Sequence, residues 1–458
     1  MSDLNTRIPT GNDVTQHFSL QPSFSENLFE RTLQRENIQA AWKRVRANKG
    51  AAGIDGMTIE EFPDWVRSGQ WERVTQELRL GIYKPDPVRR VEIEKPDGGI
   101  RQLGIPTIKD RVIQQAIAQT LTPIFDPTFS NNSFGFRPNR NGQQAAKQVQ
   151  SIIKEGRRFA VDVDLSKFFD RVNHDLLMTH LSYKLKDKEL LKLIAKYLRA
   201  GVLLKREGNK NHFEESREGV PQGGPLSPLL ANIMLDPLDK ELEKRGHKFA
   251  RYADDFTILV KSKRAGERIL NSISNYLERR LKLIVNSDKS RVVKTLESKF
   301  LGFTFRSGRI QIHPKTLHRF KEQVRRLTNR NWGPIYIKRI CAINSLKPVS
   351  IYEAGLIIFC LYLNSANCYQ LCMDLDHWIR RRVRMAYWRQ WRKPRTKVRN
   401  LMKLGVRVQA AVACGITSKG PWRSSKTPGI NQALSNAYLK TEGLYSLRDG
   451  WIKLHHSK

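Results

Sequence analysis

The spacing of hydrophobic residues predicts a helical N-terminal region. Apolar residues recur at helical spacing over residues 27–48, which indicates a basic amphipathic helix. The glycine-rich stretch 49–56 interrupts this pattern, and a second helix is expected around residues 71–80. Residues 1–25 are polar, with scattered Pro, Ser and Asn, and we expect them to be mobile or to become ordered on binding.

From residue 88 onward the pattern changes to short strands separated by helices. Two alternating segments flank a Pro-Asp-Gly-Gly turn, which predicts a β-hairpin over residues 91–105. Helices are expected over residues 111–120 and again after a loop at 131–140. Further strands are expected over residues 158–165 and on both sides of residues 254–255. Strands that alternate with helices favour a mixed α and β domain.

The C-terminal third is predicted to be helical and strongly basic. Strands fade beyond residue 311, and residues 316–327 and 350–391 show a helical pattern rich in Lys and Arg. The residues after Arg399 show no periodicity from which elements can be assigned. The longest apolar run, residues 354–363, is too short to span a membrane and is interpreted as a buried helix.

The charge of the chain points to a polyanionic partner. Its 458 residues, a length typical of roughly three domains, include 81 Lys and Arg against 44 Asp and Glu, a formal net charge of +37. Nucleic acid is the usual partner of such a surface. Acidic lipid is the alternative, and the lack of a membrane-length apolar run weakens it. The N-terminal sequence has neither a secretion signal nor a transit pattern, so a cytoplasmic location is expected.

The five cysteines are interpreted as reduced core thiols of a cytosolic protein. They lie mostly in apolar or helical surroundings, at positions 341, 360, 368, 372 and 414. Cys368 and Cys372 are four residues apart, but no second Cys or His pair accompanies them at the spacing of a zinc site.

Adjacent aspartates provide the first candidate chemistry. Asp254 and Asp255 lie between apolar residues, where two neighbouring carboxylates carry an electrostatic cost that a cation can offset. Carboxylates that hold two metal ions are what nucleotidyl transfer requires. Alone, such a dipeptide is more typical of an exposed turn. Upstream, Asp162 and Asp164 alternate in a predicted strand and so share one face; an edge strand that faces water is the alternative.

Eight segments of the chain resemble, in order and spacing, the blocks of reverse transcriptases encoded by bacterial group II introns. These segments cover 53–58, 95–106, 129–141, 161–177, 218–239, 249–259, 283–290 and 299–305. The resemblance implies an α+β right-hand polymerase, with fingers, a palm whose antiparallel sheet bears three aspartates, and a helical thumb. The domains it implies are an N-terminal extension (1–80), fingers and palm (81–310), a thumb or maturase domain (311–398) and a small basic DNA-binding region (399–458).

The resemblance also assigns roles to single residues. Asp164, Asp254 and Asp255 match the catalytic aspartates that bind two Mg²⁺ ions, with the backbone carbonyl of Leu165 as a further ligand. The residues expected to contact the incoming deoxynucleotide are Lys95, Arg101, Leu165, Phe169, Gln222 and Lys289. Phe169 matches an aromatic gate that leaves no room for a 2′-hydroxyl and so favours deoxynucleotides. Without the resemblance, Lys95 and Arg101 would be interpreted as solvated cations of a hairpin. Gln222 would then belong to a plain turn, and Phe169 to the core of the palm.

A basic segment near the C-terminus resembles the maturase-specific region of the same family. Residues 379–399 contain ten basic residues, no acidic residue and three large aromatic residues, a composition typical of RNA binding. The predicted RNA contacts are Arg380, Arg381, Arg382, Arg384, Trp388, Arg389, Arg392 and Lys393. Residues 352–359 depart from the Gly-Trp-containing element common in the family, whereas residues 420–436 resemble the ending of endonuclease-less members.

These features predict an RNA-directed DNA polymerase that also binds group II intron RNA as a maturase. Its expected partners are template and intron RNA, a DNA primer or target and deoxynucleotides, with no membrane and a possible homodimer. Three alternatives stay open: a host-adopted relative in DNA repair or attached to a CRISPR system, a non-catalytic splicing cofactor, and an RNA-dependent RNA polymerase. Retention of the three aspartates, Lys95, Arg101 and Gln222 argues against the second, and Phe169 against the third.

Overall fold

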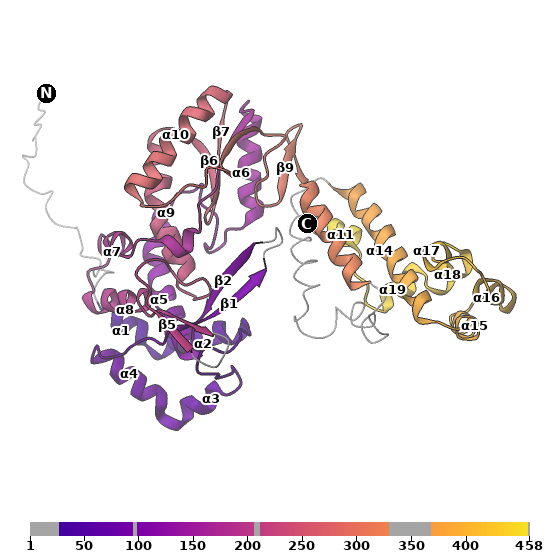
Figure 1. Cartoon of the computed structure of the whole chain (residues 1–458), viewed down its shortest axis with the longest axis horizontal. Coiled ribbons are helices and arrows are strands. Elements are labelled where there is room, and N and C mark those ends of the chain that lie inside the picture. Colours follow the sequence, from indigo (N-terminus) through magenta and orange to yellow (C-terminus); the bar gives the residue numbers. More distant parts are fainter. Residues whose placement is uncertain (1–26, 95–98, 206–210, 329–367, 457–458) are drawn as a thin grey trace, which may run out of the picture.

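The computed structural model describes residues 27–94, 99–205, 211–328 and 368–456 (Figure 1). Several predicted features lie outside these residues: the polar N-terminus, Lys95 with most of the hairpin turn, residues 350–367 of the predicted helical stretch, Cys341 and Cys360.

The N-terminal region is helical, but the single helix predicted over residues 27–48 is wrong. The structure has two helices there, α1 (Leu28–Leu33) and α2 (Arg35–Ala47). Gln34 separates them because its backbone is extended, with ψ of 138°. Two further helices follow, α3 (Phe62–Trp65) and α4 (Trp71–Arg79), and α4 confirms the second predicted helix.

A small mixed sheet lies beside these helices. Its strand order is β2 (Ile100–Ile105), β1 (Val88–Glu94), β4 (Val202–Lys205), β5 (Asn211–Glu214). The pair β1 and β2 is antiparallel, as the hairpin prediction required, whereas β1 and β4 are parallel. Helix α5 (Ile108–Phe125) follows β2 and packs against α2, with most of its residues buried.

The second sheet is antiparallel and carries the candidate site. Its order is β6 (Lys248–Tyr252), β7 (Asp255–Val260), β3 (Phe159–Val163), β8 (Arg291–Lys294). Helix α6 (Gly142–Lys154) packs against β6, and α10 (Lys263–Arg280) packs against β3 (Figure 1). The antiparallel palm sheet implied by the resemblance is therefore confirmed.

Three helices lie between strands of the two sheets, and a small hairpin follows the second sheet. They are α7 (His174–Ser182), α8 (Lys188–Leu198), α9 (Ser227–Lys244) and a small hairpin of β9 (Phe303–Arg306) and β10 (Arg309–Ile312). One apolar cluster contains Leu28 of α1, Leu78 of α4 and Phe249 of β6. The N-terminal helices thus share a core with the palm, while the predicted boundary at residue 80 stays a prediction.

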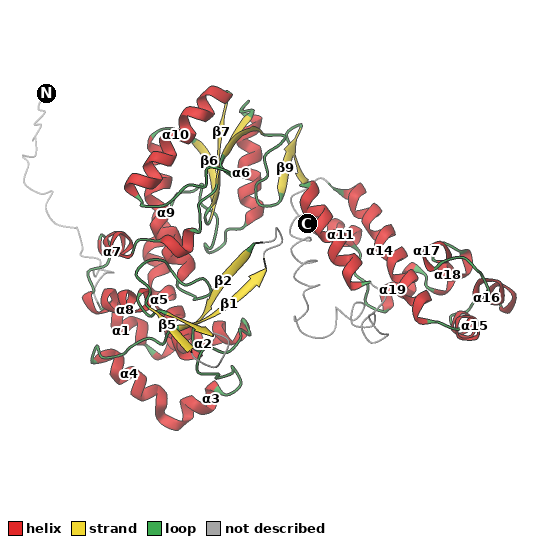
Figure 2. Ribbon diagram, viewed as in Figure 1, coloured by secondary structure: helices red, strands yellow, loops and turns green. Residues whose placement is uncertain are grey.

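The C-terminal part is entirely helical where the structure describes it and lies to one side of the two sheets (Figure 2). Its helices are α11 (Pro314–Leu327), α14 (Tyr369–Gln390), α15 (Pro394–Lys403), α16 (Val408–Gly415), α17 (Pro421–Ser424), α18 (Pro428–Ala433), α19 (Asn436–Thr441) and α20 (Leu447–His456). One apolar cluster runs from Phe320 to Leu447 and joins them. Proline begins α15, α17 and α18, where its missing N–H costs nothing.

Two further predictions concern membranes and thiols. Within the described ranges, no helix is both long and apolar enough to cross a bilayer. Cys368 and Cys372 are buried, with sulfur atoms 3.8 Å apart, and Cys414 is half-buried. The predicted core position is thus confirmed for Cys368 and Cys372, and the reduced state stays a prediction.

Candidate active site

The three predicted aspartates meet at one end of the palm sheet. Val163 at the end of β3 pairs with Phe256 of β7, and the two strands are antiparallel. Asp164, which follows Val163, and Asp255, which precedes Phe256, therefore lie at the same end of the sheet. Asp254 lies in the two-residue turn that joins β6 to β7, next to Ala253. The sheet register therefore brings together carboxylates that are ninety residues apart in the chain.

The backbone around Asp164 is fixed by the segment that contains Lys289. The Asp164 amide donates to Oγ of Ser290 at 3.0 Å, and the Asp164 carbonyl accepts from the Asn286 amide at 2.8 Å. Leu165 forms an isolated bridge with Val285, and its side chain is buried. Lys289 is exposed in this turn, so the structure brings it to the neighbourhood of Asp164.

The carboxylates perturb one another. Burial raises the pKa of Asp254, and repulsion from Asp164 raises it further, while the Arg101 guanidinium opposes the shift. Asp255 is more strongly affected. Burial, together with repulsion from Asp162, Asp254 and Asp164, raises its pKa to about 7. Asp255 is nonetheless exposed, unlike the rest of β7, which is buried. The end of the sheet is thus a region of concentrated negative charge.

Asp162 has a different role from the other three carboxylates. Its Oδ1 accepts hydrogen bonds from the hydroxyls of Thr257 at 2.9 Å and Ser298 at 3.1 Å. Burial raises the pKa of Asp162, and the two hydroxyls oppose this. Asp162 therefore lies in the wall behind Asp255, where protein hydroxyls satisfy its carboxylate.

The donor chemistry at this end of the sheet suits a hard divalent cation. Carboxylate and backbone carbonyl oxygens are the ligands that Mg²⁺ prefers, and a cation would relieve the repulsion that raises the pKa of Asp255. Among the described residues, no three His, Cys, Asp or Glu side chains are close enough to form a complete metal site by themselves. The residues therefore fit the ion in donor type.

Two predicted nucleotide contacts line one cavity. A space of about 100 Å³ beside β1 and β2 is bordered by Phe169, Gln222 and Gly104, among others. Phe169 is half-buried and makes an edge contact with Phe168, which is a core residue. Of the two phenylalanines, only Phe169 is thus placed to face a ligand. Arg101 lies exposed on β2, and Lys95 lies outside the described residues.

Glycines let the Gln222 loop approach β2 closely. The Gly104 amide donates to the Gln222 carbonyl at 2.7 Å. Gly223 has a φ of +127°, and a Cβ there would lie 2.6 Å from the Gly104 carbonyl oxygen. Any other residue at position 223 would push the loop away from the strand.

A buried ionic network beneath the Asp254 turn was not predicted. Arg251 and Asp239 form a fully buried bidentate pair, with one N–O distance of 2.7 Å. Nη1 of Arg251 also donates to Oδ1 of Asn232 at 3.0 Å and to the carbonyl of Ala253 at 2.9 Å. Arg251 thereby ties α9 to the residue that precedes Asp254.

The turn itself is strained and tightly enclosed. Ala253 has a φ of +58°, a conformation that non-glycine residues rarely adopt. A Cβ on Gly135 would lie 2.2 Å from the Ala253 amide nitrogen, so the two backbones can touch only because residue 135 is glycine. Asn232 holds Gly135 in place by donating to its carbonyl at 2.8 Å. The signal in the sequence was a charged residue, Arg251, directly after the apolar residues Phe249 and Ala250.

In the C-terminal helices, the structure corrects several predicted RNA contacts. Trp388 is only 1% exposed and packs in the helical core, so its ring faces cannot receive a base. Arg382 donates to the hydroxyl of Thr328 at 2.8 Å and to the carbonyl of Arg325 at 3.2 Å, which ties α14 to α11. Trp388 thus belongs to the helical core, whereas Arg382 is half-buried and its neutral partners orient its charge without neutralising it.

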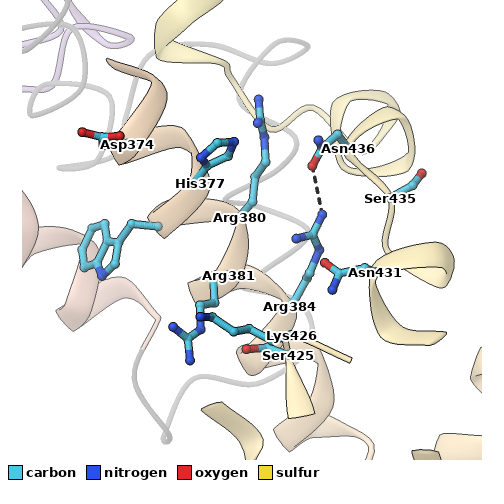
Figure 3. A pocket seen from close by; sticks show the side chains of 11 residues that line it. Asp374, His377, Arg380, Arg381, Arg384, Ser425, Lys426, Asn431, Ser435 and Asn436 are labelled. Atoms are coloured by element: carbon cyan, nitrogen blue, oxygen red, sulfur yellow. Dashed lines mark hydrogen bonds between the residues drawn. The ribbon is translucent and has the colours of Figure 1, made fainter. Parts of the chain in front are cut away.

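The other predicted contacts fall into two groups. Arg380, Arg381 and Arg384 border a polar groove between α14 and the helices that follow α16 (Figure 3). Arg392 and Lys393 are exposed at the turn between α14 and α15, whereas Arg389 is half-buried in the last turn of α14. Of these side chains, Arg392 and Lys393 are the most exposed to a ligand.

Comparison with known proteins identifies the class. Residues 93–305 match the family model of reverse transcriptase (RNA-dependent DNA polymerase), and residues 358–405 match that of the group II intron, maturase-specific domain. The chain is 31% identical over 325 residues to protein YkfC of Escherichia coli K12, covering 62% of this chain and 83% of YkfC. The chain therefore belongs to the reverse transcriptases of the group II intron type, and it carries their maturase-specific domain.

A further relative agrees with this assignment. Group II intron-encoded protein LtrA of Lactococcus lactis subsp. cremoris is 27% identical over 432 residues, covering 74% of this chain and 70% of LtrA. Among solved structures, a chain of a partial Cas6-RT-Cas1–Cas2 complex is similar, with a TM-score of 0.36 and 26% identity. That match covers 58% of this chain and 44% of the other, so this chain spans less than half of that chain's length.

Proposed function

We propose that this chain catalyses RNA-directed DNA synthesis at Asp164, Asp254 and Asp255, and that its C-terminal helices bind structured group II intron RNA to aid splicing and mobility. The observation that carries the proposal is that the three carboxylates lie at the same end of β3 and β7, where burial and mutual repulsion raise the pKa of Asp255. Charge of this kind has no structural benefit, which favours a catalytic purpose.

In this proposal Asp164, Asp254, Asp255 and the carbonyl of Leu165 hold two Mg²⁺ ions. The ions, when bound, supply positive charge to the attacking and leaving oxygens of the transferred phosphoryl group. The contribution of the chain is to hold its carboxylates in position. The register of β3 and β7, the Ser290 hydrogen bond and the Arg251 network supply that rigidity.

The neighbouring side chains would select and orient the incoming deoxynucleotide. Arg101, which lies close enough to Asp254 to lower its pKa, is suited to the triphosphate, together with Lys95 and Lys289. Gln222 and Phe169 line one cavity, so the amide can position the nucleotide while the ring excludes a 2′-hydroxyl. A DNA primer, cytoplasmic location and homodimer stay predictions.

Primer extension on an RNA template tests this function. With Mg²⁺ and deoxynucleotides, we expect the wild type to extend a DNA primer and Asp254→Asn to lose about a thousandfold or more in rate, the equivalent of roughly 4 kcal/mol. Ribonucleotides should be rejected by the wild type and accepted roughly tenfold to a hundredfold better by Phe169→Ala. A wild type that binds RNA but extends no primer would overturn the polymerase and leave an RNA-binding splicing cofactor.

A further inference from the structure

A buried histidine, His174, contacts the lining of the cavity that Phe169 and Gln222 border. It is the first residue of α7 and is only 6% exposed. Its ring Nε2 lies 2.7 Å from the carbonyl oxygen of Gly219, which borders the cavity. Because a carbonyl oxygen can only accept, Nε2 carries the proton and donates it. His174 itself does not border the cavity, so any effect on a bound nucleotide acts through Gly219.

The hydrogen bond from His174 completes a short ladder between two segments of the chain. One segment carries Phe169 and Val172, and the other begins at Gly219. The Val220 amide donates to the Phe169 carbonyl at 2.6 Å, and the Gly219 amide donates to the Val172 carbonyl at 2.8 Å. With the bond from His174, both backbone polar groups of Gly219 are paired with one continuous stretch of chain that leads from Phe169 into α7.

The two segments approach so closely that a side chain at position 219 would not fit. Gly219 has a φ of +89°, in the left-handed region that favours glycine. A Cβ there would lie 2.8 Å from the Asp170 carbonyl oxygen and 3.0 Å from that of Phe169. Since residue 219 has no side chain with which to anchor itself, the ring of His174 supplies a side-chain anchor from the opposite segment.

The segment that begins at Gly219 is also held at its other end. The Pro221 carbonyl accepts from the Ser227 hydroxyl at 2.7 Å, and the Gln222 carbonyl accepts from the Gly104 amide at 2.7 Å. The segment is thus anchored to α7, to α9 and to β2. His174 closely follows Phe169 in the chain, so its anchor is the one that relates the position of this segment to that of Phe169.

We propose that His174 is a positioning residue for the choice of the nucleotide's sugar: its hydrogen bond to Gly219 fixes the separation of Phe169 from Gln222, and thereby the space left for the sugar. The inference rests on the proposed function and deepens it, because it names a residue outside the cavity that controls which nucleotide the cavity accepts. The cavity measures about 100 Å³, so a small movement of one wall changes its size appreciably. Exclusion of a hydroxyl by shape alone therefore depends on the rigidity of that wall.

Single-nucleotide primer extension on an RNA template, with a deoxynucleotide or the matching ribonucleotide, tests this role. The measured quantity is the ratio of kcat/KM for the two substrates. His174→Phe keeps an aromatic ring but cannot donate, and should lower the ratio about tenfold, mainly through a lower KM for the ribonucleotide. His174→Gln places an amide N–H near the position of Nε2 and should keep the ratio within about threefold of the wild type.

A stability control separates positioning from folding. Leu177→Val changes a fully buried residue on the same helix, and should lower the melting temperature without changing the ratio. His174→Ala gives the same comparison if the phenylalanine is not accommodated. The proposal is overturned if the variants that cannot donate are as selective as the wild type, or if Leu177→Val or His174→Gln loses selectivity as fully as they do.

Hydrogen exchange over residues 216–224 reports on the anchor without using the polymerase. His174→Phe should speed exchange of the Gly219 and Val220 amides by about tenfold, because both amides belong to the ladder that His174 completes. His174→Gln should leave their exchange near that of the wild type. A wild type that extends no primer would overturn the proposed function, whereas unchanged exchange in His174→Phe would overturn the anchoring role, so the two failures are distinguished.

Discussion

The palm and the C-terminal helices both concentrate charge of one sign, but they hold it in different ways. In the palm, negative charge gathers at the ends of two paired strands, and a fully buried ion pair of Arg251 and Asp239 supports the turn that carries Asp254. In the C-terminal helices, positive charge covers α14, and its guanidinium groups are held by neutral carbonyls such as that of Leu434. The difference indicates that each region is completed by an opposite ligand charge: cations in the palm and phosphates at the helices.

In the palm, the rigidity of the turn that carries Asp254 depends on Arg251. Replacing it by Met leaves Asp239 buried without its partner, which should cost about 3 to 5 kcal/mol of unfolding free energy, measured by urea denaturation. The double variant Arg251→Met with Asp239→Leu removes both charges and should recover most of that stability.

Activity separates a positioning role from a purely structural one. Since neither variant can donate to the Ala253 carbonyl, primer extension by the double variant should stay low although its stability returns. Recovery of the rate in parallel with stability would mean that Arg251 contributes only to folding and does not position the turn.

On the helical side, Trp388→Ala should act on stability rather than on binding. The side chain is buried in the C-terminal core, so its removal leaves a cavity that costs about 3 kcal/mol. Denaturation of the variant should reveal this loss, while RNA affinity under folding conditions changes little. If the variant had normal stability but bound RNA more weakly, Trp388 would contact RNA and the assignment to the core would be wrong.

A smaller effect is expected at the exposed end of α14. Arg392→Gln combined with Lys393→Gln removes two exposed cations, so unfolding should be unchanged within about 0.5 kcal/mol. RNA affinity should fall by about threefold to tenfold, with a flatter salt dependence. Comparison of this double variant with Trp388→Ala, in both unfolding and RNA affinity, distinguishes the residues that face a ligand from those of the core.

The sequence predicted the palm better than the C-terminal region, for physical reasons. Alternating residues and a Gly-containing turn specify a hairpin locally, so β1 and β2 appear where the pattern indicated. The approach of Asp164 to Asp255 was inferred only by resemblance, because strand register depends on contacts distant in the chain. In α14, basic and aromatic residues surround the helix, so periodicity alone could not indicate that Trp388 faces the core and Arg392 faces solvent.

Two details of the fold depend on tertiary contacts. The break at Gln34 interrupts a continuous helical pattern, and the packing of α1 and α2 on α5 explains it only once α5 is in place. The partners of Arg251 are Asn232 and Asp239, seven residues apart on the buried face of α9, and their meeting with β6 is a tertiary contact. Polar residues on buried faces are the feature of the sequence that points to such networks.

The central claim is that the palm carboxylates repel one another until a cation binds, and stability against pH measures this most directly. The pKa of Asp255 is raised to about 7 in the folded chain and is about 3.9 in the unfolded chain. The contribution of this group to the free energy of unfolding is therefore fully present below about pH 4 and is lost as the pH rises through about 7. Without metal, the wild type should therefore lose about 1 kcal/mol more than Asp255→Asn between pH 5 and about pH 8, after allowance for solvent screening. Added Mg²⁺ should remove this difference. Identical pH profiles for the two proteins, unaffected by Mg²⁺, would contradict the account.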